Sequence, residues 1–274
     1  MKIYFTFCCC IFSLAVIPHA KAQKQNDDLF YIFKKDWSSA KNLDDAAYFM
    51  QVTKENDTTY VCRYYNKLGP MVKQESYYDA DLSIPNGRFC WYNANGDIDT
   101  IGSVYHGKKD ENWYYYHDTT LLKKEWYESG HLAERKDYEH RLYTGKDGKT
   151  ITLEEKNLQD SLNAAGSDTT ITLEQVPAKY KNGEKDWTNY ISKNLKTPDR
   201  LMNELGRGEH RVCVVFLVDK EGNTADIYIL HSCEWSGDNE VIRLIKDSPK
   251  WQPATQNGKK VFYRQKQWIT YSVN

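Results

Sequence analysis

Four residues in the C-terminal part of the chain have side chains that commonly bind metal ions. His210 and Cys213 lie on one predicted strand, and His231 and Cys233 follow the strand expected to pair with it. If the connecting turn centres on Glu221, then Cys213, His231 and Cys233 share a face of the sheet. They would be staggered by more than zinc–ligand bonds of about 2.0–2.3 Å allow. The sequence therefore predicts no metal site and no cofactor.

Motifs of well-known catalytic chemistry are absent from the chain. It contains no G-x-S-x-G, no H-E-x-x-H and no glycine-rich phosphate loop, and its seven His are scattered. The net charge is −1 with acids and bases interspersed, so no basic field attracts nucleic acid. We therefore expect a binding protein that is not an enzyme and has no nucleic-acid partner.

The first 22 residues have the composition of a secretory signal peptide. Lys2 precedes an apolar run over residues 3–17, and Ala20-Lys21-Ala22 forms a small-x-small cleavage site. The run is shorter than the about 20 residues that a transmembrane helix needs. We expect cleavage after Ala22 and a periplasmic protein. The alternative is an uncleaved anchor in the inner membrane that faces the periplasm, and only then would the protein associate with a membrane.

Cysteine usage fits an exported chain. Removal of the signal peptide leaves Cys62, Cys90, Cys213 and Cys233. An even number in an exported protein permits disulfides, and Cys62–Cys90 is the candidate pair. Four cysteines are too few for a disulfide scaffold in a chain of 274 residues, so we favour buried thiols.

An aromatic repeat occupies residues 60–138. One copy reads N-G-R-F-C-W-Y over residues 86–92 and the next reads D-E-N-W-Y-Y-Y over residues 110–116, so that Phe89 corresponds to Trp113. Each unit is an aromatic strand, a turn with Gly or Asn and a second strand, which predicts a hairpin. One hairpin cannot bury its apolar face alone, and the repeat therefore predicts stacked hairpins in an elongated sheet.

The aromatic side chains of the repeats have two interpretations. They could bind sugars or a protein partner, or they could form the hairpin core. The core is favoured because cross-strand aromatic pairs stabilise sheets. The residues concerned are Trp91, Trp113, Tyr115 and Trp126.

Residues 170–274 have a mixed α and β pattern. The predicted elements are a strand ended by Pro177, a helix over 187–195, strands over 211–218 and 224–230, a helix after 237–239, and a strand over about 260–273. This order, β-α-β-β-α-β, predicts an antiparallel sheet with both helices on one face. The chain is therefore mainly β plus α+β, and its predicted parts are a signal peptide (1–22), a lead-in segment (23–59), hairpin repeats (60–138), a linker (139–169) and an α+β domain (170–274).

The hairpin units resemble MORN-type repeats in the diverged form found in bacterial envelope proteins. Residues 105–116, Y-H-G-K-K-D-E-N-W-Y-Y-Y, are similar to the core G-x-x-x-G-x-W-x-Y-Y of that family. Asn112 stands where the family has its second Gly, and Asn is the next best residue at positive φ. The resemblance implies a sheet of stacked MORN-like hairpins.

The C-terminal domain resembles that of the TonB energy transducers, in the single-chain form found in Bacteroidetes-like bacteria. Four stretches carry the resemblance in the family's order: V-P-A-K-Y-K-N-G at 176–183, Y-I-S-K-N-L-K-T-P at 190–198, the strand and turn at 208–222, and P-K-W-Q-P-A at 249–254 followed by N-G-K at 257–259. Thr197 replaces a Tyr of the family, and Lys260 replaces a Pro. We recognise neither the transmembrane anchor nor the Pro-rich spacer that a force-transmitting member needs.

The TonB resemblance implies capture of a peptide by strand addition. In that family an extended segment of an outer-membrane receptor pairs with the sheet beside its last strand, so that backbone bonds supply affinity and side-chain pockets supply specificity. The residues implied here are Val261, Phe262, Tyr263, Arg264, Lys266 and Trp268. Two alternatives stay open. Arg264 and Lys266 could instead guard an exposed edge against aggregation, and the protein could be a structural envelope protein that binds partners through its aromatic repeats.

Overall fold

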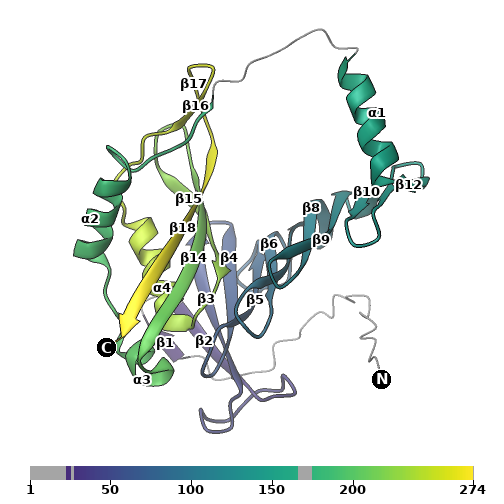
Figure 1. Ribbon diagram of the computed structural model, residues 1–274. Helices are drawn as coiled ribbons and strands as arrows, with labels where there is room; N and C mark the ends of the chain where they lie inside the picture. The colour runs from purple at the N-terminus through teal and green to yellow at the C-terminus, as the bar shows by residue number, and fades with distance from the viewer. Residues whose placement is uncertain (1–22, 26–27, 166–174, 274) are drawn as a thin grey trace.

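Residues 23–25, 28–165 and 175–273 are described by the computed structural model, with eighteen strands and four helices in those ranges (Figure 1). The predicted signal peptide and residues 166–174, which include the start of the first strand expected in the C-terminal domain, lie outside the described residues. No helix in the described ranges is long and apolar enough to cross a membrane.

The first twelve strands form one antiparallel sheet in which every strand pairs with the next along the chain. We call it the N-terminal sheet. It consists of β1 (Gln23–Gln25), β2 (Asp28–Phe33), β3 (Tyr48–Asn56), β4 (Thr59–Asn66), β5 (Met71–Tyr77), β6 (Gly87–Tyr92), β7 (Ile98–Tyr105), β8 (Lys108–His117), β9 (Thr120–Glu128), β10 (His131–Asp137), β11 (Leu142–Thr144) and β12 (Thr150–Thr152). The expectation of stacked antiparallel hairpins in a long sheet is confirmed.

The repeat spacing places equivalent aromatic residues on equivalent strands. Phe89 lies on β6 and Trp113 on β8, and both belong to one buried cluster on the same face of the sheet. The Trp113 ring lies directly over Gly102 of β7, where a Cβ would come within 2.1 Å of the ring. Trp113 Nε1 also donates to the carbonyl of Ser103 at 2.9 Å. The favoured core role of Trp113 therefore agrees with its burial.

The sheet extends beyond the residues predicted as repeats. The lead-in segment (23–59) holds β1, β2 and β3, and the predicted linker (139–169) holds β11, β12 and helix α1 (Leu153–Ala165). A capping box starts α1: Glu155 N–H donates to Thr152 Oγ1 at 3.1 Å, and Thr152 N–H donates to Glu155 Oε2 at 2.8 Å. The Thr-x-x-Glu signal for this helix start is present in the sequence.

The described residues of the C-terminal region, 175–273, form three helices and six strands. They are β13 (Gln175–Val176), α2 (Glu184–Asn194), α3 (Asp199–Leu205), β14 (Gly208–Val218), β15 (Thr224–His231), α4 (Trp235–Lys246), β16 (Ala254–Gln256), β17 (Lys259–Val261) and β18 (Tyr263–Val273). The strands form two sheets, in the orders β15-β14-β18 and β13-β16-β17.

Three details of the C-terminal region differ from the sequence prediction. The first expected strand, β13, pairs with β16 in a separate sheet instead of joining β15-β14-β18. Pro198 follows the end of α2 as expected, but its extended backbone also starts the extra helix α3 as its N-cap residue. The final strand is divided at Phe262: β17 pairs with β16, whereas β18 pairs with β14. A short turn with positive φ at Asn257 and Gly258 folds β17 back onto β16, which separates it from the long strand.

Helix α4 lies between the N-terminal sheet and the sheet β15-β14-β18. Its apolar side, including Val241 and Leu244, belongs to the core cluster shared with Val214 and Phe216 of β14. On its other side the Trp235 ring packs edge-on against Phe49, with the ring centroids 5.9 Å apart. The C-terminal region thus covers one end of the N-terminal sheet, while β10 to β12 and α1 project away from it (Figure 1).

The two faces of the N-terminal sheet differ in what covers them. Buried Gln51, Arg63, Gln74 and Cys90 stand opposite one another on β3 to β6, and we call their face the inner face because α4 packs on it. Cys62 is paired with Glu75 and therefore lies on the opposite, outer face.

The face assignment explains the state of the thiols. Cys62 and Cys90 lie on opposite faces and belong to different core clusters, so the candidate disulfide does not form. Cys62, Cys90 and Cys213 are buried free thiols and Cys233 is a partly buried one. The preference for thiols over a disulfide agrees with this arrangement.

We predict that Gly96→Ala destabilises the protein much more than a glycine replacement with backbone strain alone. Gly96 has φ +86°, and a Cβ there would lie 2.0 Å from the Ser232 carbonyl oxygen of the C-terminal region. The control is Gly206→Ala, since Gly206 has φ +73° and open space around it. The control should lose about 1–2 kcal/mol of unfolding free energy, and Gly96→Ala more than twice that. Urea denaturation of both variants checks this, and equal losses would contradict it.

Candidate functional site

The sequence-predicted site falls on an open edge of the C-terminal sheet. Strand β14 is central, and β18 pairs with it along its whole length, from Gly208 opposite Val273 to Val218 opposite Tyr263. No strand in the described ranges pairs with the other side of β18. An unpaired strand edge presents a row of backbone N–H and C=O groups, and this row is a template for a further strand.

The opposite edge of the same sheet, β15, is closed by the N-terminal sheet. Tyr92 of β6 donates its hydroxyl proton to the Ile229 carbonyl at 2.7 Å, and Ser232 N–H donates to the Gly96 carbonyl at 2.8 Å. His231 forms a bridge with Asp97, and its Nδ1 lies 2.7 Å from Asp97 Oδ1. These contacts cover the C-terminal end of β15. Within the described residues, β18 is therefore the edge of this sheet that is unpaired along its whole length.

Three of the six predicted residues lie together on one face of β18. Arg264, Lys266 and Trp268 alternate with inward-facing residues, and all three are exposed. The Trp268 ring is 43 % exposed although it belongs to a regular strand. The edge therefore carries two cations followed by one large aromatic surface.

The other three predicted residues lie at the start of the edge. Phe262, between β17 and β18, is 58 % exposed, and Lys220 Nζ lies 5.5 Å from its ring centroid. Val261 and Tyr263 pack against the shared core instead. Phe262 is thus available to a partner, whereas Val261 and Tyr263 hold the strand in place.

The charged groups of the edge are partly neutralised. Asp226 Oδ2 accepts from Arg264 at 2.7 Å and from Arg88 of the N-terminal sheet at 2.5 Å. Lys266 forms no ion pair within the described residues, and its Nζ lies 5.9 Å from the Trp268 ring centroid. Lys266 is therefore the uncompensated positive charge of this strand.

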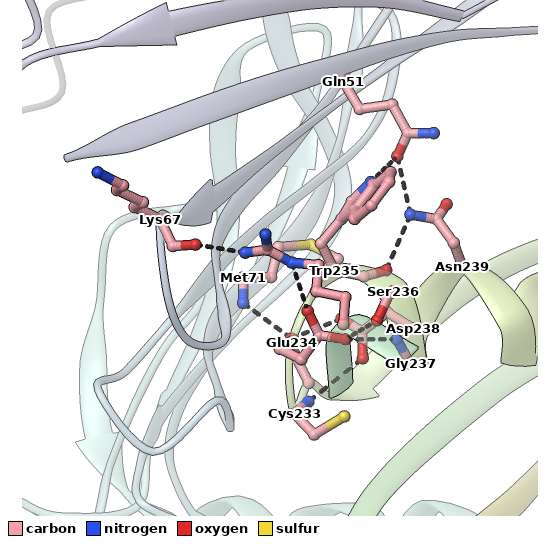
Figure 2. A network of polar contacts seen from close by, with 12 residues as sticks. Gln51, Lys67, Met71, Cys233, Glu234, Trp235, Ser236, Gly237, Asp238 and Asn239 are labelled. Atoms are coloured by element: carbon pink, nitrogen blue, oxygen red, sulfur yellow. Dashed lines mark hydrogen bonds and ion pairs between the residues drawn. The ribbon is translucent and has the colours of Figure 1, made fainter. Parts of the chain in front are cut away.

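A buried polar junction around the start of α4 holds the edge in position (Figure 2). Ser232 Oγ accepts from Met71 N–H at 2.8 Å and donates to Asp238 Oδ2 at 2.5 Å. Cys233 N–H donates to the other carboxyl oxygen of Asp238 at 3.2 Å. Asp238 is completely buried, and burial raises its pKa to about 8.

A second carboxyl group, Glu234, joins three segments at the same junction. It caps α4 by accepting from Gly237 N–H at 2.8 Å, and it accepts from Arg200 Nε of α3 at 3.1 Å. The Arg200 guanidinium also donates to the Lys67 carbonyl of the N-terminal sheet. Glu234 is 1 % exposed, so this charge is both buried and paired, as buried charges must be.

Gln51 supplies a third set of contacts on the inner face. Its Oε1 accepts from Trp235 Nε1 at 2.9 Å and from Asn239 Nδ2 at 3.0 Å, as Figure 2 shows. At the other end of α4, Lys246 Nζ lies 2.5 Å from Glu55, which also pairs with Arg63. Both ends of the helix are therefore attached to the N-terminal sheet.

One hydrogen bond links this junction to the candidate edge. The hydroxyl of Tyr271 on β18 donates to the Gly237 carbonyl at 2.8 Å. A Cβ at Gly237 would lie 2.8 Å from Cys233 Sγ and 3.4 Å from the Tyr271 ring, so only glycine allows this approach. The junction thereby fixes the C-terminal half of β18 relative to the N-terminal sheet.

Sequence reasoning missed the junction, although it placed a helix start at Gly237-Asp238-Asn239. The signal it lacked is Glu234 as an N-cap three residues before Gly237. The partners Gln51, Lys67 and Met71 are far away in the chain, and no short motif indicates them.

The candidate metal ligands are arranged differently from the expectation. Cys213 pairs directly with His231 across β14 and β15, whereas the sequence predicted a stagger. A bulge next to this pair shifts the register. His231 Nδ1 is engaged by Asp97, and the described residues contain no group of three or more His, Cys, Asp or Glu able to hold a metal ion.

No family model, curated protein or solved structure matches the chain.

We predict that Asp238 lowers the stability of the folded protein as pH rises. Its pKa is 3.8 when unperturbed and about 8 in the fold, so between these values the unfolded state binds fewer protons. The unfolding free energy contributed by this group therefore falls from about pH 4 to about pH 8 and then levels off.

Asp238→Asn tests this pH effect because asparagine has a similar shape and no proton to lose. The stability of the wild type relative to the variant should fall between pH 5 and pH 8.5 by an amount on the order of a few kcal/mol. Urea unfolding of both proteins at the two pH values measures it. Parallel pH dependences of the two proteins would show that Asp238 does not titrate in this way.

Proposed function

We propose that the protein binds an extended peptide by strand addition along β18. The observation that supports this most is the asymmetry of the sheet: the β15 edge is occupied by Tyr92, Gly96 and Asp97, whereas the β18 edge has no partner strand in the described ranges. Strand β18 pairs with β14 without a bulge, so its outer backbone groups form a regular row. Such a row binds a peptide through main-chain hydrogen bonds.

The side chains of the edge define the chemistry of the proposed peptide. A strand paired with β18 would place alternate side chains beside Arg264, Lys266 and Trp268, because cross-strand neighbours share a face. The uncompensated charge of Lys266 favours an acidic residue, and the exposed Trp268 ring favours an apolar or aromatic one. The proposed ligand is an extended segment in which acidic and apolar residues share one face.

The resemblance to TonB C-terminal domains supplies the biological part of the proposal. The peptide would come from an outer-membrane TonB-dependent receptor or another envelope protein, and the protein would act in the periplasm without catalysis. The three-stranded sheet with α4 on one face and an open last strand is compatible with that domain, as the twelve-stranded sheet is with MORN-like hairpins. Binding rather than chemistry is the proposed role, because a sheet edge supplies backbone bonds and no reacting group.

A pair of proline variants tests the strand-addition proposal. Neighbouring residues of a strand point their N–H groups to opposite edges, so one of Lys266→Pro and Gln267→Pro removes a donor from the β14 ladder and the other removes one from the free edge. The variant that keeps the wild-type melting temperature identifies the free-edge position. We expect it to bind a TonB-box-like receptor peptide at least tenfold more weakly in calorimetric titration.

The controls for this titration are the wild type and a peptide with proline at its central position. Wild-type protein should bind the unmodified peptide and not the proline peptide. Absence of binding to the wild type, or equal binding by the folded proline variant, would rule out strand addition at β18.

Lys266→Thr separates the binding role of this lysine from a role as an edge guard. We expect it to lower the affinity for the acidic peptide several-fold and to reduce the salt dependence of binding, because it removes the uncompensated charge. Titrations at two salt concentrations measure this. A variant that binds the peptide as the wild type does, but self-associates in sedimentation velocity, would show that Lys266 only guards the edge.

A further inference from the structure

The far end of the N-terminal sheet contains a pocket that peptide binding at β18 does not use. It has a volume of about 200 Å³ and lies across β8, β9 and β10. These strands run toward the end of the sheet where α1 lies, away from β18 (Figure 1). Ligand pockets for drug-sized molecules have volumes of about 300–1,000 Å³. This pocket is therefore suited to a smaller group, comparable to a single ring.

Trp126 forms an aromatic surface in the pocket. It stands between Asn112 on β8 and Glu134 on β10, its direct cross-strand partners. Its ring is 36 % exposed, whereas Trp113 of the same repeat sheet is 2 % exposed. The only hydrogen bond of Trp126 Nε1 within the described residues is a long one to Glu128, at 3.4 Å. The hairpin core therefore does not account for this ring.

Asn112 contributes a polar atom that has no partner. Its Oδ1 is buried and accepts no hydrogen bond in the described residues, although the side chain lines the pocket. A buried acceptor without a hydrogen-bond partner is unfavourable. Asn112 therefore places a polar side chain at the wall of the pocket.

The charged side chains that line the pocket are three lysines and two glutamates, so the lining has a net charge of +1 and favours an anion. Lys124 and Lys136 stand directly opposite each other on β9 and β10, and like charges in this position destabilise a sheet. Lys146 is compensated by Glu128, with Nζ and Oε1 2.5 Å apart. A carboxylate between Lys124 and Lys136 would relieve their repulsion.

We propose that this pocket binds one pyranose ring that carries a carboxylate, as in an acidic glycan. The apolar face of the sugar ring stacks on Trp126, one hydroxyl lies beside the Asn112 side chain, and the carboxylate lies between Lys124 and Lys136. A nucleotide offers an aromatic ring and a negative charge as well, but its base, ribose and phosphate together exceed a pocket of this size.

The test compares galacturonate and glucuronate oligomers with their neutral galactose and glucose counterparts. The full chain is titrated by calorimetry, and saturation-transfer NMR identifies the sugar protons in contact. We expect at least one acidic oligomer to bind at least tenfold more tightly than its neutral counterpart. Trp126→Ala should weaken this binding at least tenfold, and Trp126→Phe, which keeps an aromatic ring, should keep most of it.

Two further variants define the roles of the polar groups. Lys124→Gln with Lys136→Gln should remove the preference for the acidic oligomer, and Trp268→Ala on the distant β18 edge should leave the affinity for the acidic oligomer unchanged. Absence of binding to both acidic oligomers, equal affinity for the neutral ones, tighter binding of a nucleotide, or binding unaffected by Trp126→Ala would each overturn the proposal.

Discussion

The contacts that satisfy the outer backbone groups of β15 are the constraint on which the rest of the account depends. A three-stranded sheet has two edges, and each edge exposes hydrogen-bonding groups that bind another strand unless something covers them. Tyr92 and Gly96 of the β6–β7 hairpin cover one edge through the Ile229 carbonyl and the Ser232 N–H. The N-terminal sheet therefore has a defined structural role: it leaves β18 as the one unpaired edge of this sheet within the described residues.

The junction around α4 fixes the position of the C-terminal region relative to the N-terminal sheet. Asp238 and Glu234 are buried and bonded within the C-terminal region, and their partners Ser232 and Arg200 also bond to the N-terminal sheet. Separation of the parts would therefore remove the bonds of Ser232 to Met71 N–H and of Arg200 to the Lys67 carbonyl. Tyr271 connects the same helix start to β18. The junction and the edge are thus parts of one rigid unit, and a peptide on β18 would bind to a strand that is already in position. Such preorganisation reduces the ordering that accompanies binding.

Much of this fold is readable from the sequence, but the contacts between its parts are not. The equivalence of Phe89 and Trp113 predicted the stacked hairpins, because the repeat spacing equals two strands of the sheet. The alternating residues of β14 and the turn after Val218 predicted the central hairpin.

The linker prediction was incomplete, because low aromatic content hid β11 and β12, although the capping box of Thr152 and Glu155 was readable. The sequence predicted the site as six residues along the last strand. Only the alternation of side chains in the folded strand separates exposed Lys266 and Trp268 from inward-facing Tyr263. The closure of β15 by Gly96 depends on residues more than a hundred positions apart, and no local pattern encodes it.

Hydrogen exchange of the full chain, followed residue by residue in the absence and presence of a receptor peptide, tests the central claim most directly. We expect the Ser232 amide, which is bonded to the Gly96 carbonyl, to be protected in the free protein. We also expect alternate amides of β18 to exchange rapidly and to become protected when the peptide binds. Rapid exchange at Ser232 together with peptide-induced protection along β15 would contradict the account, because it would show that the N-terminal sheet leaves the wrong edge open.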